Sequence, residues 1–223
     1  MIRVTLPDGA VKEVPKGTTP FEVAQSISEG LARNIISASY NQTTIETSTP
    51  LETDGSLTLF TWKDEEGKKA FWHSSAHLLA QAIEQLYPGV SLTIGPAIEQ
   101  GFYYDVDFKE YTISEKDFST IEKRALEIAK EKHLFKMRSV SKADALDFYK
   151  TQGNPFKVEL IENLIDGDIT FCDHSDFTDL CRGGHLPNTG FIKAFKLLSV
   201  AGAYWRGDEN KPQLTRIYGI SFP

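Results

Sequence analysis

The chain has 223 residues, of which 40% are hydrophobic and 25% charged, and its formal net charge at neutral pH is −7. This composition is typical of a globular protein with room for two domains. It excludes a membrane protein, since no run approaches the roughly 20 apolar residues of a bilayer span, and it offers nucleic acid no overall attraction. With no signal-peptide core and only two cysteines, we expect a cytoplasmic protein without disulfides.

Residues 1–62 are predicted to form one small domain. Apolar and polar residues alternate on both sides of Asp8-Gly9, which predicts a β-hairpin. A helix is predicted to begin at Pro20 and to end at Gly30. Further short strands follow, with a second turn predicted at Asp54-Gly55. Strands and one helix in this order favour a β-grasp arrangement, a small sheet covered by a helix.

Residues 63–223 are predicted to form a larger α+β domain, joined to the first by a charged linker at 63–70. Its first helix carries the sequence HSSAH near its start and ends at Pro88-Gly89. Helices and strands are then segregated along the chain and do not alternate as in a Rossmann fold. We expect strands at 91–108, helices at 114–133 and 141–152, and mostly strands and loops at 155–164, 168–176, 190–205 and 214–222.

Two pairs of nitrogen and sulfur side chains share one spacing. His73 and His77 lie four residues apart in the predicted helix, so both rings project from one face, and Cys181 and His185 repeat this spacing in the loop CRGGH. Together they suit a tetrahedral zinc site. They also suit a metal-free site in which imidazoles activate a water, or a cysteine nucleophile beside a histidine. If the two pairs have no function, the first consists of half-exposed helix histidines and the second of a buried thiol beside a histidine in a turn.

Three further residues are candidates for a site. Tyr104 could offer a hydroxyl to a substrate, although aromatic residues in a strand are more often part of the core. Asp179 could orient a histidine or accept an ammonium group, although an acid in a turn is usually exposed. Lys157 alternates with apolar neighbours, which predicts either a solvated strand lysine or a cation of the site.

A basic and aromatic segment at 191–219 is the candidate for a nucleic-acid patch. Bases would stack on its rings and phosphates would pair with its cations. A solvated face over an aromatic core is the commoner explanation of such a mixture. The cations are Lys193, Lys196, Arg206, Lys211 and Arg216, and the rings between them are Tyr204, Trp205 and Tyr218.

Four segments together resemble the amino-terminal half of bacterial-type threonyl-tRNA synthetases. They are HSSAHLLAQAI, GPAIEQGFYYD, DLCRGGHLPNTG and FKLLSVAGAYWRGDENKPQLTRIYG, in the same order, and the resemblance covers nearly the whole chain. It implies that residues 1–62 form a TGS domain, which is a β-grasp module. It also implies that residues 63–223 form an α+β editing domain related to that of alanyl-tRNA synthetases. The chain departs from the family at Gly184, where relatives often carry proline or valine.

The resemblance implies hydrolysis of the ester in seryl-tRNA(Thr), the product of charging tRNA(Thr) with serine in place of threonine. It implies that His73 with Lys157 activates water or transfers a proton, and that Asp179 holds the substrate's ammonium or hydroxyl group. The other matching residues shape the pocket. The catalytic candidates are His73, His77, Lys157, Cys181 and His185, and the substrate-binding candidates are Tyr104 and Asp179.

The resemblance also implies a cofactor state and partners. In the alanine-specific relatives the corresponding cluster binds zinc, whereas threonyl editing is generally described as working without it. We therefore expect that editing requires no cofactor. Zinc bound by the four His/Cys residues is the alternative. The expected partner is tRNA(Thr) carrying serine. The class II catalytic and anticodon-binding domains of the family are absent here, so we expect a monomeric fragment of a homodimeric enzyme that does not itself charge tRNA.

Two rival hypotheses belong to other functional classes. TGS domains also occur in regulatory proteins, so the chain could be a non-catalytic RNA-binding module. It could also be a zinc-stabilised structural domain, which chelation should unfold. Loss of hydrolysis in a His73→Ala variant with unchanged RNA binding would favour the enzyme.

Overall fold

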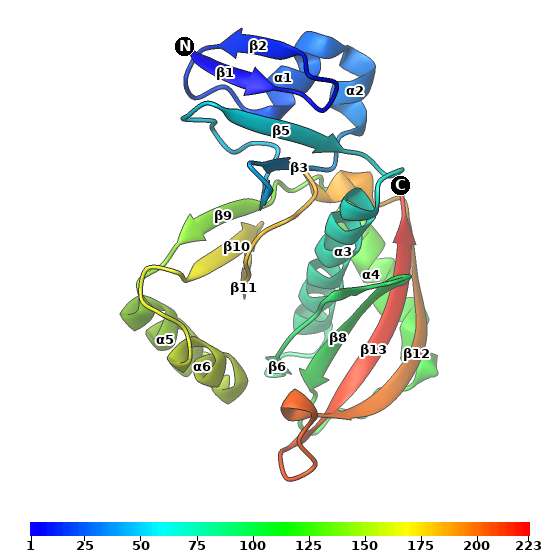
Figure 1. Cartoon of the computed structure of the whole chain (residues 1–223). Helices are drawn as coiled ribbons and strands as arrows, with labels where there is room; N and C mark the ends of the chain where they lie inside the picture. Colours follow the sequence, from blue (N-terminus) through cyan, green and yellow to red (C-terminus); the bar gives the residue numbers. More distant parts are fainter. The chain divides into compact units, whose positions relative to one another are not determined.

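The computed structural model describes all 223 residues, Met1–Pro223. The chain divides into two compact units, of which the first comprises Met1–Ser74 with Gly183–Pro187 and the second Ser75–Arg182 with Asn188–Pro223. Each unit contains helices and a sheet (Figure 1), so the α+β class predicted from the sequence is confirmed. None of the helices is long and apolar enough to cross a membrane.

A five-stranded sheet with the order β2-β1-β5-β3-β4 is the framework of the first unit. β1 pairs antiparallel with β2 across the turn at Asp8-Gly9, as predicted, and parallel with β5. Val4 and Leu57 of this sheet form a core with Val23 of the helix α1, which confirms the β-grasp arrangement. The strands are β1 (Ile2–Thr5), β2 (Val11–Val14), β3 (Ser37–Tyr40), β4 (Thr43–Ile45) and β5 (Gly55–Phe60).

Two local predictions in the first unit are wrong. Asp54-Gly55 is not a turn between paired strands, because β4 and β5 both pair with β3. The helix α1 (Pro20–Ile27) begins as predicted but does not end at Gly30, because Ser28 ends it and caps a second helix, α2 (Glu29–Asn34). The Ser28 hydroxyl accepts a backbone N–H of the first turn of α2, and this capping outweighs the helix-ending tendency of Gly30.

The charged segment at 63–70 is helical from Glu65 onward, so the predicted linker is wrong. It forms the first turns of α3 (Glu65–Leu86), the helix that carries HSSAH. Gly67 is required there by close packing, since a Cβ atom at this position would lie 1.9 Å from the carbonyl oxygen of Thr61. Gly67, which in the sequence indicates flexibility, is therefore required for close packing.

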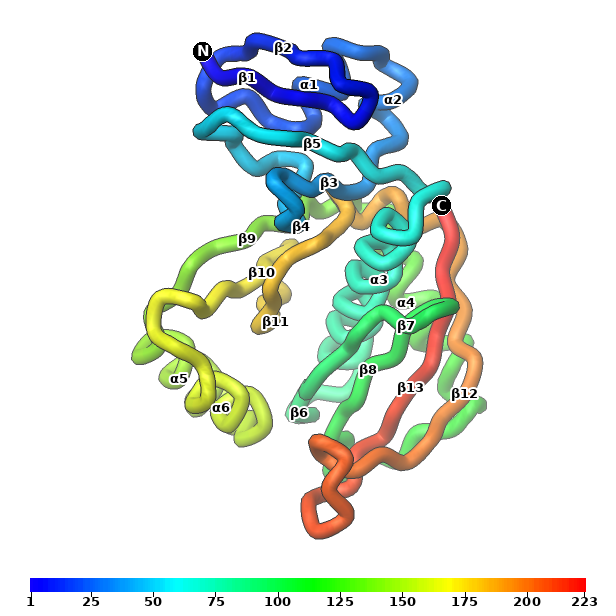
Figure 2. Tube along the Cα trace, viewed as in Figure 1, coloured from blue at the N-terminus to red at the C-terminus, as the bar shows by residue number.

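The larger sheet of the second unit is antiparallel and has the order β12-β13-β8-β6, with β7 beside β8 (Figure 2). The helix α4 (Phe118–Lys130) packs on β12. Ser114, the first residue of the helix predicted at 114–133, caps the 3-10 turn Glu115–Asp117 that leads into α4. The strands are β6 (Ser91–Leu92), β7 (Ala97–Ile98), β8 (Gly101–Asp107), β12 (Ala194–Tyr204) and β13 (Gln213–Phe222), and two further 3-10 turns lie at Thr189–Phe191 and Trp205–Gly207.

A smaller antiparallel sheet, β11-β10-β9, and the helix pair α5 and α6 complete the second unit. The segment at 155–164 was expected to be extended and is instead mostly the helix α6. Asn154 caps it and Pro155 occupies its first turn, and these start signals outweigh the local alternation of polar and apolar residues. The elements are β9 (Lys136–Ser139), α5 (Lys142–Thr151), α6 (Pro155–Glu162), β10 (Thr170–His174) and β11 (Phe177–Leu180).

Candidate active site

Asp179 is the centre of a buried polar cluster in the second unit. One carboxylate oxygen lies 2.7 Å from Nζ of Lys157. The other accepts a hydrogen bond of 2.8 Å from the hydroxyl of Tyr104 and lies 3.2 Å from Nδ1 of His77. All four residues are at most 3% exposed. The structure therefore brings together four of the seven residues singled out in the sequence.

The positions of Asp179 and Lys157 differ from the simplest expectation for each. Asp179 is not in an exposed turn but on β11, opposite Cys172 of β10. Lys157 is in the first turn of α6, where its N–H is bonded to the capping side chain of Asn154. The amide of Asn154 also donates to the carbonyl oxygen of Leu92. This cap anchors the start of α6 to the end of β6 and so holds Lys157 in place.

Charge pairing in this cluster opposes the effect of burial on each pKa. Burial raises the pKa of Asp179, but Lys157 and His77 outweigh it and hold that pKa well below its usual value. Burial lowers the pKa of His77, but Asp179 and Cys181 outweigh it and raise the pKa above its usual value. Burial and the neighbouring Asp179 both raise the pKa of Tyr104, so its phenol stays protonated. Asp179 is therefore ionised at neutral pH.

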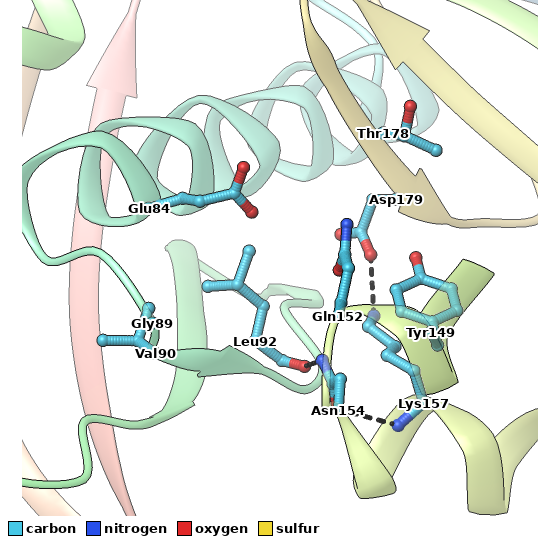
Figure 3. A pocket seen from close by; sticks show the side chains of 10 residues that line it. All are labelled: Glu84, Gly89, Val90, Leu92, Tyr149, Gln152, Asn154, Lys157, Thr178 and Asp179. Atoms are coloured by element: carbon cyan, nitrogen blue, oxygen red, sulfur yellow. Dashed lines mark hydrogen bonds and ion pairs between the residues drawn. The ribbon is translucent and has the colours of Figure 1, made fainter. Parts of the chain in front are cut away.

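A pocket of about 170 Å³ opens beside the ion pair of Lys157 and Asp179 (Figure 3). This is comparable to the roughly 150 Å³ of an engineered protein cavity that binds benzene, so the pocket has room for a small organic group. Glu84 of α3 reaches it, and burial followed by the nearby Asp179 raises the pKa of Glu84. The lining residues are Glu84, Gly89, Val90, Leu92, Tyr149, Gln152, Asn154, Lys157, Thr178 and Asp179.

The first unit contains the other half of the predicted constellation. The rings of His73 and His185 lie with their centroids 4.8 Å apart. Nδ1 of His185 lies 3.0 Å from Oε1 of Glu46, which also accepts the N–H of Gly184. His185 is fully buried and His73 half-buried. His185 is thus held in a buried polar contact, whereas His73 is a half-exposed helix histidine whose ring lies beside that of His185.

The residues that could hold a metal are the four predicted from the sequence. His73 and His77 are one turn apart in the uninterrupted helix α3, and Cys181 and His185 belong to one loop. Three of the four, His77, Cys181 and His185, are buried. Three imidazoles and one thiol are a zinc-type donor set, and Nδ1 of both His77 and His185 faces a carboxylate, as is usual for histidines that bind metal through the other nitrogen. The buried cluster is consistent with a zinc site.

Two contributors were not found from the sequence. Glu46 lies in a polar run, TTIETST, without any motif, and only the fold shows its contact with His185. Asn154 is not among the predicted site residues, because the alternation of polar and apolar residues after it favours a strand. The sequence Asn-Pro followed by apolar residues at helical spacing is a helix-start signal that could have revealed it.

The basic and aromatic segment has fewer available cations than its sequence indicates. Arg216 forms two hydrogen bonds with Asp105 and stacks on Tyr103. Lys211 pairs with Glu159, and Lys196 pairs with Glu122. Trp205 is buried and donates to the Glu159 carboxylate. These contacts favour the interpretation of this segment as a sheet with internal ion pairs over that of a nucleic-acid patch.

Comparison with known proteins gives matches along the whole chain. Residues 2–61 match the model of the TGS domain, and residues 169–218 match the model described as the threonyl and alanyl tRNA synthetase second additional domain. Over all 223 residues the chain is 67% identical to a threonine–tRNA ligase of Flavobacterium johnsoniae and 66% identical to one of Flavobacterium psychrophilum. A threonine–tRNA ligase of Cytophaga hutchinsonii is 56% identical. The chain spans 34 to 35% of the length of these relatives.

Proposed function

The chain belongs to the threonyl-tRNA synthetase family, as a portion with a TGS domain and the second additional domain, and from this premise we propose that it hydrolyses the ester of tRNA(Thr) mischarged with serine. A synthetic site for threonine discriminates against serine by a single methyl group. One such group changes binding by only about 1–3 kcal/mol, and aminoacyl-tRNA synthetases that face this problem add a second, hydrolytic site. We assign that hydrolytic role to this chain.

The observation that carries the proposal is the Asp179 cluster beside a small pocket. An aminoacyl ester presents an ammonium group, a polarised carbonyl and, for serine, a small hydroxyl. Asp179 is ionised and could accept the ammonium or the hydroxyl. Lys157, buried in an ion pair with it at 2.7 Å, provides a fixed positive charge where negative charge develops on the carbonyl oxygen. Tyr104 donates to Asp179 and thereby orients its carboxylate.

The proposed reaction is attack of a water on the ester carbonyl carbon. The His73 imidazole accepts the proton of the attacking water, which makes the oxygen nucleophilic. Lys157 stabilises the resulting oxyanion. When the tetrahedral intermediate collapses, the bond from carbon to the ribose oxygen breaks and that oxygen takes up the proton that His73 accepted, which releases serine and tRNA. His77, Cys181 and His185 complete the catalytic set by shaping and orienting the site.

We propose that this reaction needs no cofactor. If zinc is bound by His73, His77, Cys181 and His185, the metal would supply Lewis-acid polarisation and a more acidic water. The protein groups described above would keep their roles in binding and orientation in either case. The effect of chelation on hydrolysis distinguishes these alternatives.

The remaining parts of the proposal concern organisation and partners. We propose that the TGS domain extends over residues 1–62 and the editing domain over residues 63–223. The substrate is tRNA(Thr) carrying serine, which is a cytoplasmic molecule. The ligase activity of the family is assigned to the class II catalytic domain, with anticodon recognition in a further domain of a homodimeric enzyme.

A His73→Ala variant tests the catalytic hypothesis against a binding-only module. We expect release of serine from seryl-tRNA(Thr) to fall by at least about 100-fold, in the range typical of lost general-base catalysis, with unchanged tRNA affinity. A matched control is His133→Ala, since His133 is at the surface and its ring contacts Glu131. A chain that binds tRNA but releases no serine, with or without His73, would contradict the proposed function.

A further inference from the structure

We propose that Glu46, from the β-grasp portion of the chain, is a positioning residue for hydrolysis. It holds the ring of His185 with the proton on Nδ1 and fixes the backbone of the loop that carries it. This inference rests on the proposed function for its catalytic consequence. The contacts that support it all lie within the first unit.

Glu46 makes three contacts with two consecutive residues of the loop. Its Oε1 accepts the N–H of Gly184 at 2.8 Å and lies 3.0 Å from Nδ1 of His185. Its Oε2 accepts the backbone N–H of His185 at 3.1 Å. The side chain of His185 is 0% exposed and that of Glu46 only 13%. A carboxylate that is largely removed from water and has donors at both oxygens makes a structural contact, unlike a carboxylate in a solvent-exposed ion pair.

The contact decides which nitrogen of His185 carries the proton. A carboxylate can only accept hydrogen bonds, so Nδ1 must be the donor in this pair. A neutral His185 therefore has its lone pair on Nε2, and the hydrogen bond at one nitrogen determines the chemistry at the other. Only this tautomer can accept a proton or a metal at Nε2. The ring of His73, with its centroid 4.8 Å away, is in the same group of side chains.

The loop needs this support because of its own backbone. Gly183 and Gly184 have φ values of +104° and +87°, a region that other residues rarely adopt. Two successive glycines give the loop many unfolded conformations, so local interactions must select the one observed. Glu46 supplies two backbone contacts at this point, and Cγ2 of Thr44 in β4 lies near Gly184. The loop is thus attached to the strand β4 and its extension.

A glutamine at position 46 would not reproduce this arrangement. The amide group has one acceptor oxygen, and its NH2 group is a donor. The NH2 group of the glutamine would then face one of the N–H groups that Glu46 accepts, and two donors cannot form a hydrogen bond with each other. A Glu46→Gln variant keeps the volume and loses the acceptor, which separates positioning from packing.

The first test is the tautomer of His185 in the 223-residue chain itself. Selective ¹⁵N labelling of the five histidine rings distinguishes protonated from unprotonated nitrogens, and the His185 signals are assigned as those that disappear in a His185→Gln variant. The inference predicts Nδ1 protonated and Nε2 unprotonated in metal-free wild type, and a shift toward the opposite tautomer in Glu46→Gln. The opposite tautomer in wild type would overturn it without any variant.

The second test is kinetic. We expect Glu46→Gln to lower kcat for serine release by about 10- to 100-fold, the range seen when the residue orienting a functional histidine is lost, with KM changed less than threefold. Glu52→Gln is the matched control, because Glu52 is an exposed carboxylate of the same unit, and it should match wild type. A Glu46→Gln variant with wild-type kcat would overturn the inference.

The two tests separate this inference from the proposed function. If wild type releases no serine, the proposed function fails, but the tautomer measurement still decides whether Glu46 positions His185. If wild type is active and the His185 tautomer does not respond to Glu46→Gln, the proposed function stands and the positioning role is wrong.

Discussion

Lys157 and Asp179 form an ion pair of 2.7 Å in which the two side chains are 3% and 4% exposed. Lys157 comes from the first turn of α6 and Asp179 from β11, so the pair joins two elements that are far apart in the sequence. In a pair so deeply buried, each charge is stabilised by the other, because either charge alone would be strongly disfavoured. Predictions about stability and activity follow from this relationship.

Removing one member of the pair should destabilise the chain strongly. Lys157→Met leaves the Asp179 carboxylate buried without its cation, and we expect a loss of about 3–5 kcal/mol in the free energy of unfolding. The double variant Lys157→Met with Asp179→Asn should lose less than the sum of the two single variants, because no charge is left unpaired. Urea denaturation of the four proteins measures both effects. Additive losses would contradict the coupling of the two residues.

A surface pair provides the control for that experiment. Lys196 contacts Glu122 at 3.2 Å, but its side chain is 69% exposed. Solvent screening makes such a pair worth less than about 1 kcal/mol. We therefore expect Lys196→Met to change the unfolding free energy far less than Lys157→Met does.

Stability should fall at acid pH because of Asp179. Its folded-state pKa lies below the value of 3.8 for a free carboxyl group. A group with a lowered folded pKa contributes stability above its unfolded pKa and loses that contribution as the pH falls toward the folded value. The contribution of Asp179 should therefore be constant near neutral pH and decline below about pH 4. Asp179→Asn should show a flatter stability curve in that window, and an unchanged slope would contradict the assignment.

Gly184→Ala should reduce both stability and hydrolysis. The φ of +87° at Gly184 costs a residue with a Cβ atom about 1–2 kcal/mol, and the displaced backbone would misplace the adjacent His185. Gly9→Ala is a matched control, because its φ is +86° and nothing lies within 4 Å of a Cβ atom there. Thermal unfolding should show a similar loss for both variants, while only Gly184→Ala should slow serine release. Equal activity of the two variants would show that the geometry of the loop is irrelevant to catalysis.

Asn154→Ala tests the importance of the helix cap that holds Lys157. The loss of an N-cap costs about 1 kcal/mol, and the bond to the carbonyl oxygen of Leu92 is lost as well. We expect a reduced rate of serine release because Lys157 is no longer fixed. Ser141→Ala removes the corresponding cap of α5 and should cost somewhat less stability, without the kinetic effect. Matching kinetics for the two variants would contradict a role for the cap in positioning Lys157.

Local signals predicted many of the elements correctly, because each has a short-range cause. The hairpin at Asp8-Gly9 and the helix start at Pro20 depend on residues within a few positions of each other. The segment at 63–70 failed because its charges and Gly67 indicate a flexible linker, whereas the contact of Gly67 with Thr61 exists only in the folded chain. The prediction of extended structure at 155–164 is wrong because the cap formed by Asn154 outweighs the local alternation of polar and apolar residues.

The candidate site could be predicted where its residues carry a motif or belong to a segment that resembles a known family. His73 and His77 share a helix turn, and Cys181 and His185 share a loop, so the spacing within each pair predicts that its two residues lie together. That these four residues act together with Lys157 and Asp179 is what the family resemblance implies, since no local pattern links α6 to β11. Glu46 has neither a motif nor a resemblance to indicate it. Its role depends on a contact across 139 positions of the sequence, and contacts of that kind follow from the fold alone.

The most direct test of the central claim is deacylation of seryl-tRNA(Thr) and threonyl-tRNA(Thr) by this chain at high protein concentration, with and without a chelator. We predict release of serine, much slower release of threonine, and no effect of the chelator. The full-length enzyme, assayed in parallel, shows whether tRNA is delivered to the site. Absence of serine release from both proteins, or equal release of serine and threonine, would contradict an editing function.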